Sequence, residues 1–103
     1  EQLQQRINKQ PLSPLYLADK TTLINIMEMV SGLFLSKNIV YQNGKPAYLV
    51  DLAKAFEWLF NIKIGDCYQK HEDVIKRKPG KLTGFLNGLV ELIKKEHDKK
   101  GYR

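Results

Sequence analysis

The strongest constraint on this chain is a run of apolar residues between positions 48 and 60 that recurs at helical spacing. The apolar positions follow the i, i+3, i+4, i+7 pattern: Leu49, Leu52, Ala53, Phe56, Leu59 and Phe60. Asn61 comes next, at a position where helices often end in a left-handed conformation. The pattern therefore predicts an amphipathic helix over residues 48–60 that packs one face against a core.

An earlier helix is expected over residues 20–36, with Asp19 as its N-cap. Its apolar residues cover most of its circumference, which is typical of a helix surrounded by others. These residues are Leu23, Ile24, Ile26, Met27, Val30, Leu33 and Phe34. We therefore expect it to be the central and most buried helix.

A third helix is predicted over residues 67–78, because Asp66 and Gln69 have the spacing of a capping box. Its apolar stripe is thin, and we expect Tyr68, His71 and Ile75 to face the core. Most of its surface is then exposed and charged.

Pro79 and Gly80 interrupt the chain, and a fourth helix is expected over residues 84–99 with Thr83 as its cap. Its inward side chains are predicted to be Leu82, Phe85, Leu86, Leu89, Leu92 and Ile93. Gly88 is interpreted as the site of a close helix contact.

These elements predict a mainly α fold of four principal helices in a helix-turn-helix or winged-helix-like arrangement. At most a short two-stranded β element is expected, formed by residues 15–17 and 39–41 and followed by a turn at Asn43-Gly44. Residues 1–14 are interpreted as a linker or the end of an upstream helix, and residues 15–103 as the domain. Because the chain starts with Glu1, we expect it to be the C-terminal part of a longer protein, whose missing N-terminal part is a possible site of self-association.

The composition argues against several classes of function. One cysteine excludes a disulfide framework, and two histidines do not make a conventional metal centre. Cys67 and His71 share a helix face, but no glycine-rich nucleophile turn or phosphate loop accompanies them. We expect a cytoplasmic protein that is not an enzyme, with no cofactor, no metal, no small-molecule substrate and no membrane association.

The positive charge is concentrated in the second half of the chain. Residues 61–103 hold eleven basic and six acidic side chains, whereas residues 1–60 hold six and five. Two helices joined by a short connection, the second sparsely apolar, have the outline of a helix-turn-helix. The predicted partner is double-stranded DNA. Seven side chains are expected to contact it: Lys63, Gln69, Lys70, Lys76, Arg77, Lys78 and Lys81.

The alternative is a non-catalytic protein-interaction module that dimerises or docks through its apolar helices. In that case the charged helix face is merely solvated, and the basic residues complement helix ends. Reversing the charges of Arg77 and Lys78 is expected to weaken DNA binding and leave the fold intact.

Several stretches resemble the RteC family of Bacteroides-type mobile-element regulators. The resemblance spans residues 16–93 and rests on four segments: Asp19-Lys20-Thr21-Thr22-Leu23, Asn43-Gly44-Lys45-Pro46, residues 60–68 and residues 77–86. It implies a regulator of conjugative-transposon excision genes with a winged-helix-like C-terminal DNA-binding domain. It also implies DNA contact by the third helix and the basic loop that follows it.

Overall fold

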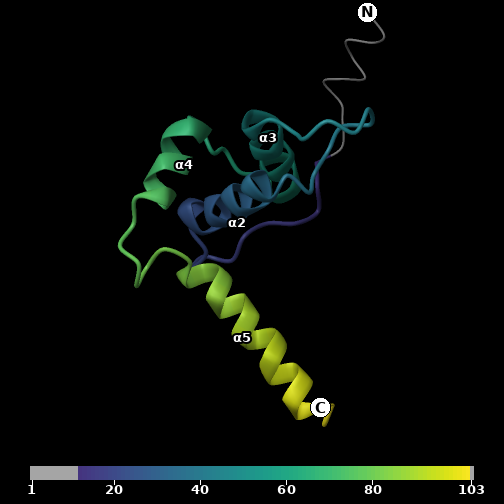
Figure 1. Cartoon of the computed structure of the whole chain (residues 1–103), viewed down its shortest axis with the longest axis vertical. Coiled ribbons are helices and arrows are strands. Elements are labelled where there is room, and N and C mark those ends of the chain that lie inside the picture. Colours follow the sequence, from purple (N-terminus) through teal and green to yellow (C-terminus); the bar gives the residue numbers. More distant parts are fainter. Residues whose placement is uncertain (1–11, 103) are drawn as a thin grey trace, which may run out of the picture.

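The computed structural model describes residues 12–102, which form four helices and no named strand. The helices are α2 (Leu23–Ser36), α3 (Leu49–Phe60), α4 (Cys67–Ile75) and α5 (Gly84–Lys99). Figure 1 shows α2, α3 and α4 packed together, with α5 leading away from them. The mainly α prediction is confirmed, whereas the linker or upstream helix expected before residue 12 lies outside the described residues.

The helix α2 is central, as its apolar circumference predicts. It packs against α3, α4 and α5, and Ile26, Met27 and Val30 are buried. The helix begins three residues later than expected, because Thr22 and not Asp19 is its N-cap. The Thr22 hydroxyl accepts a hydrogen bond from the Asn25 backbone N–H at 3.3 Å. This bond satisfies a backbone donor in the first turn, and the helix therefore starts at Leu23.

The end of α3 anchors the segment that enters the domain. Asn61 has a φ of 54°, which confirms the predicted left-handed C-cap. Its side-chain amide donates to the backbone carbonyls of Ser13 and Leu15, at 2.7 and 2.9 Å. Ser13, which the sequence placed in a linker, is consequently buried against the helices.

The predicted pairing between residues 15–17 and 39–41 is wrong, because the Tyr41 N–H donates to the Lys45 carbonyl and the Ile39 carbonyl accepts from the Ala47 N–H, both at 2.9 Å. The second of these segments instead folds back on itself, with an isolated antiparallel bridge between Val40 and Pro46. The turn predicted at Asn43-Gly44 is confirmed, since the Asn43 side chain accepts from the Lys45 N–H at 2.9 Å. The β content of residues 12–102 is this one bridge.

Within residues 12–102, it is the first part of α5 that packs against another helix. Phe85, Leu86 and Leu89 are half-buried, as predicted, but Leu92 and Ile93 are 63% and 71% exposed. Their inward assignment is therefore wrong: the helix leads away from α2, and no other helix of residues 12–102 faces its later turns (Figure 1). The contact predicted for Gly88 is also wrong as far as the described residues go, since a Cβ there would meet none of their atoms within 4 Å.

None of the helices among residues 12–102 combines the length and apolar character needed to cross a membrane.

Candidate nucleic-acid interface

The orientation of α4 decides which of its side chains face outward. Cys67 and Val74 are buried, whereas Tyr68 and Ile75 are 60% and 44% exposed. The core assignment of Tyr68 and Ile75 is therefore wrong by one residue, which is a helix rotation of about 100°. The assignment of His71 to this inner face is confirmed, because it is half-buried and contacts α2.

The contacts of His71 explain this rotation. Its Nδ1 lies 2.7 Å from the hydroxyl of Ser31, and its ring meets Phe34 edge-on with centroids 5.7 Å apart. Both partners belong to α2, about 40 residues earlier in the chain. A short helix with a thin apolar stripe takes its orientation from such tertiary contacts.

The start of α4 is fixed by Asp66. Its carboxylate accepts from the backbone N–H groups of Tyr68 and Gln69, both at 3.1 Å, which confirms the predicted N-cap. The Gln69 side chain does not complete a capping box, because it donates to Asp73 at 3.0 Å. Gln69 is exposed on the outer face of the helix, as expected.

The other predicted contact residues of α4 differ in exposure. Lys76 is exposed and lies 4.0 Å from Asp73, whereas Lys70 is half-buried. Lys63 is exposed in the connection that precedes α4. Within α4 itself, Glu72 and Asp73 outnumber the single lysine, Lys70, so the positive charge lies at the C-cap Lys76 and beyond it.

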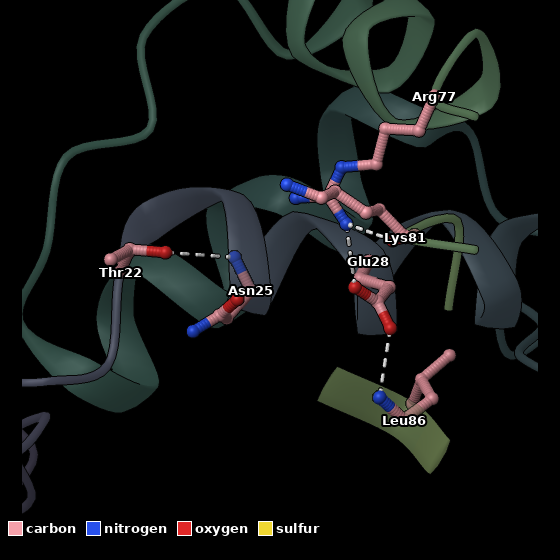
Figure 2. A network of polar contacts seen from close by, with 6 residues as sticks. All are labelled: Thr22, Asn25, Glu28, Arg77, Lys81 and Leu86. Carbon is pink, nitrogen blue, oxygen red and sulfur yellow. Dashed lines mark hydrogen bonds and ion pairs between the residues drawn. The ribbon is translucent and has the colours of Figure 1, made fainter. Parts of the chain in front are cut away.

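The helix ends at Ile75, three residues before the predicted end, and the chain turns so that Arg77 points inward. The Arg77 guanidinium donates to the Glu28 carboxylate at 2.9 Å and to the Lys81 carbonyl at 3.2 Å. The other Glu28 oxygen accepts from the Leu86 N–H at 2.8 Å. Figure 2 shows this network joining α2, the loop and the start of α5.

Glu28 was not identified from the sequence. Its side chain is 1% exposed, and it is the acidic residue within an apolar stretch of α2. A buried carboxylate requires a partner, so this isolated acid was the signal for a basic residue elsewhere in the chain. The Arg77 side chain, at 22% exposure, supplies that partner.

Lys78 and Lys81 remain exposed on the loop between α4 and α5. The Lys81 N–H donates to the Lys78 carbonyl at 2.8 Å, which closes a tight turn around Pro79 and Gly80. This turn holds the two lysines on one short segment. The loop is therefore fixed at its base by Arg77 and presents two unpaired cations among the described residues.

A hollow of about 370 Å³ lies between this loop, the first turns of α2 and the start of α5. Its lining residues are Asn25, Glu28, Arg77, Lys78, Gly80, Lys81, Gly84 and Phe85. Because the Arg77 guanidinium balances the charge of Glu28, Lys78 and Lys81 leave the hollow with a net positive charge.

Cys67 and His71 do not form a reactive pair in this arrangement. The thiol is buried, which raises the pKa of Cys67, and the His71 Nδ1 is bonded to Ser31. No group of three or more potential metal ligands occurs among residues 12–102.

The fold and the surface define a small, mainly helical domain with a basic loop beside a short, partly exposed helix. The family described as RteC protein matches residues 2–100, and the chain therefore belongs to the RteC family. The sequence is also 33% identical over 93 residues to Exportin-T of Chaetomium globosum. That match covers 84% of this chain but only 9% of the exportin, so it indicates no function here. No solved structure gives a significant match.

Proposed function

We propose that this domain binds double-stranded DNA sequence-specifically and regulates transcription, controlling excision or transfer genes of a conjugative transposon. The proposal rests on one observation above all. The basic loop after α4 holds Lys78 and Lys81 exposed, while Arg77 ties its base to the buried Glu28. The cations are thus carried on a fixed segment, which is what phosphate contacts need to set a register on DNA.

The pairing of α3 with α4 supports a helix-turn-helix interpretation. The two helices pack together and both contact α2, and the inner face of α4 is made by Cys67, His71 and Val74. This leaves Gln69 on the outer face, where an amide can bond an adenine edge in the major groove. The lysines at and beyond the end of the helix would then contact flanking phosphates.

Membership of the RteC family supports the mobile-element context. The resemblance of residues 60–68 and 77–86 to that family covers the connection before α4 and the basic loop. These segments carry three of the exposed candidate contacts: Lys63, Lys78 and Lys81. We propose that these segments bind DNA in the cytoplasm without a cofactor, and that this binding regulates transcription.

The contribution of each predicted contact residue differs in this proposal. Lys76, Lys78 and Lys81 bind phosphates, Gln69 reads a base, and Lys63 and Lys70 contribute at the periphery. Arg77 acts mainly by positioning the loop, because its guanidinium is held by Glu28 and the Lys81 carbonyl.

The test is binding of the purified chain to a random pool of DNA duplexes, with selection and sequencing at two salt concentrations. We expect an enriched motif, with weaker binding at the higher salt because phosphate contacts release counterions. Binding without any enrichment would contradict sequence-specific recognition. Absence of binding at the lower salt would contradict the proposal as a whole.

A second candidate, a protein-interaction module, is favoured by the exposed apolar side chains of α5. Leu92 and Ile93 are 63% and 71% exposed, on the part of the helix that no other helix of the described chain faces. Exposed apolar surface of this kind often marks an interaction site. Sedimentation of the chain over a range of concentrations tests it: a larger species that disappears in a Leu92→Gln/Ile93→Gln variant supports this candidate, and a monomer throughout contradicts self-association.

A further inference from the structure

The hollow between α2, the basic loop and α5 is built from groups that suit an anion. Lys78 and Lys81 line it and make no ion pair with any residue among 12–102. Figure 2 shows Lys81 in the network around Arg77, whose guanidinium donates to the Lys81 backbone carbonyl. Lys78 and Lys81 carry like charges on one tight turn, and like charges held on so short a segment repel each other, so a bound anion relieves that repulsion.

The acidic residue of the hollow does not oppose this interpretation. Both oxygens of Glu28 are used, one by Arg77 at 2.9 Å and the other by the Leu86 N–H at 2.8 Å. Its charge is balanced by Arg77, so an anion in the hollow meets the two lysines. Arg77 is therefore a positioning residue here, because it neutralises Glu28 and fixes the loop.

Asn25 adds a neutral hydrogen-bond donor. It lies in the first turn of α2, lines the hollow and makes no side-chain hydrogen bond to the described residues. The mouth is open beside it, since a Cβ at Gly80 or Gly84 would meet nothing within 4 Å. The volume of about 370 Å³ holds a phosphodiester with several waters, each of which occupies about 30 Å³.

We propose that this hollow binds one backbone phosphate of DNA, with Lys78 and Lys81 as its cationic contacts and Asn25 as a hydrogen-bond donor. The choice of DNA as the source of the phosphate rests on the proposed function. The site places a DNA strand across the starts of α2 and α5, at the loop that follows α4. This extends the interface to α2, which the α3–α4 pair alone does not include.

The experiment compares two Asn→Asp variants of the whole chain that carry the same change in charge. Asn25→Asp puts a carboxylate in the hollow, whereas Asn43→Asp changes the remote turn and keeps an oxygen for the Lys45 N–H. Binding to a DNA duplex is measured over a range of salt concentrations. We expect Asn25→Asp to weaken binding about tenfold and to lower the slope of log K against log salt by about one. Asn43→Asp is expected to change both much less.

Folding of the variants is verified by thermal unfolding. An acidic residue in the first turn of a helix is favourable, so Asn25→Asp is expected to fold normally. If it does not, Asn25→Ala removes the donor alone and is expected to weaken binding several-fold with no such effect for Asn43→Ala.

A second measurement separates this site from the proposed function. Inorganic phosphate is added to the chain, and the amide resonances of Gly80, Lys81 and Gly84 are followed by NMR against a sodium chloride control of equal ionic strength.

Selective shifts that disappear in Asn25→Asp support the site, even if the chain fails to bind DNA and the proposed function is lost. Equal effects of the two Asp variants on DNA binding, without selective phosphate shifts, would overturn the site and leave DNA binding standing. Selective loss of DNA binding in Asn25→Asp without shifts by free phosphate supports a site that takes phosphate only as part of DNA. If neither DNA nor phosphate binds, the site and the proposed function both fall.

Discussion

The Glu28 carboxylate in α2 accepts a hydrogen bond from the Arg77 guanidinium, 49 residues later in the chain, at 2.9 Å. This ion pair is largely buried, since the side chains are 1% and 22% exposed. It joins the most buried helix to the loop that carries the candidate DNA contacts. Because the second Glu28 oxygen binds the Leu86 N–H, the same carboxylate also fixes the start of α5.

Arg77→Met is expected to destabilise the fold, because it leaves the Glu28 charge buried without its partner. Removal of one member of a buried pair costs about 3–5 kcal/mol, and the partial exposure of Arg77 favours the lower end of that range. Urea unfolding measures the loss. Reversal of Arg77 and Lys78 together, proposed from the sequence as harmless to the fold, is therefore expected to unfold the domain in part.

Two further variants give the control for this prediction. Lys78→Met changes an exposed neighbour and should alter the free energy of unfolding by less than about 0.5 kcal/mol. Adding Glu28→Gln to Arg77→Met should recover part of the loss, since no buried charge then remains. A stability of Arg77→Met equal to that of Lys78→Met would contradict the role assigned to the ion pair.

Sequence reasoning succeeded where the signal is local. The helical period over residues 48–60 placed α3 to within one residue, and Asp66 was identified as a cap from its spacing alone. It failed on the orientation of α4, because Cys67 with Val74 and Tyr68 with Ile75 have the same seven-residue spacing. The choice between these pairs is made by contacts with α2, which no local pattern contains.

The same limit applies to the candidate site and to α5. The basic residues of the loop were found from composition, but the pairing of Arg77 with Glu28 depends on tertiary structure. An apolar stripe shows which face of a helix is available for packing, not that a partner is present. Leu92 was assigned to the core on that stripe, yet the helix carries it away from α2.

Asn61→Ala is expected to cost about 2–3 kcal/mol of stability. The change removes two hydrogen bonds, to the Ser13 and Leu15 carbonyls, and leaves alanine in a left-handed conformation that costs about 1–2 kcal/mol. Asn61→Gly loses the same bonds without that conformational cost, so urea unfolding should show it to be less destabilised by about 1 kcal/mol. Equal stabilities of the two variants would show that the left-handed conformation adds no cost for alanine beyond the lost hydrogen bonds.

The Cys67 thiol is expected to resist alkylation in the folded protein. Burial raises the pKa of Cys67, and the thiolate is the reactive form. At pH 8, iodoacetamide should modify the native chain at least about tenfold more slowly than the urea-unfolded chain, whose thiol has a pKa of about 8.5. Equal rates for the two states would show that the thiol is accessible.

The raised pKa also gives a direction for the dependence of stability on pH. The unfolded thiol loses its proton near pH 8.5 while the folded one keeps it, so the unfolded state binds fewer protons above that pH. The contribution of Cys67 to the free energy of unfolding is therefore fully present below about pH 8.5 and decreases as the pH rises above it. Urea unfolding at a series of pH values above 8.5 measures this decrease. In Cys67→Ala the free energy of unfolding should fall less over the same pH range, because the thiol is absent.

Leu92→Gln and Ile93→Gln are expected to leave the free energy of unfolding within about 0.5 kcal/mol of the original, because both side chains are already exposed. Leu86→Gln, the same change on the half-buried part of α5, should cost about 1–3 kcal/mol. Urea unfolding at low protein concentration makes the comparison. A large loss in the Leu92 or Ile93 variant would show that α5 packs against something in solution.

The lysines of the basic loop are expected to account for a defined part of the salt dependence of DNA binding. Each phosphate contact contributes about 0.9 to the slope of log K against log salt on duplex DNA. Lys78→Gln/Lys81→Gln should therefore lower that slope by about 1.8 and weaken binding at low salt. Because neither side chain has an ion-pair partner among the described residues, stability should change little.

The matched control removes the same charge from another part of the chain. Lys94→Gln/Lys95→Gln lies on the projecting part of α5, away from the loop, and should leave the slope nearly unchanged. Measuring both variants by fluorescence anisotropy at five or more salt concentrations separates phosphate contact from net charge. Equal slopes in the two variants would mean that DNA responds only to the total charge of the chain, and the loop would lose its assigned role.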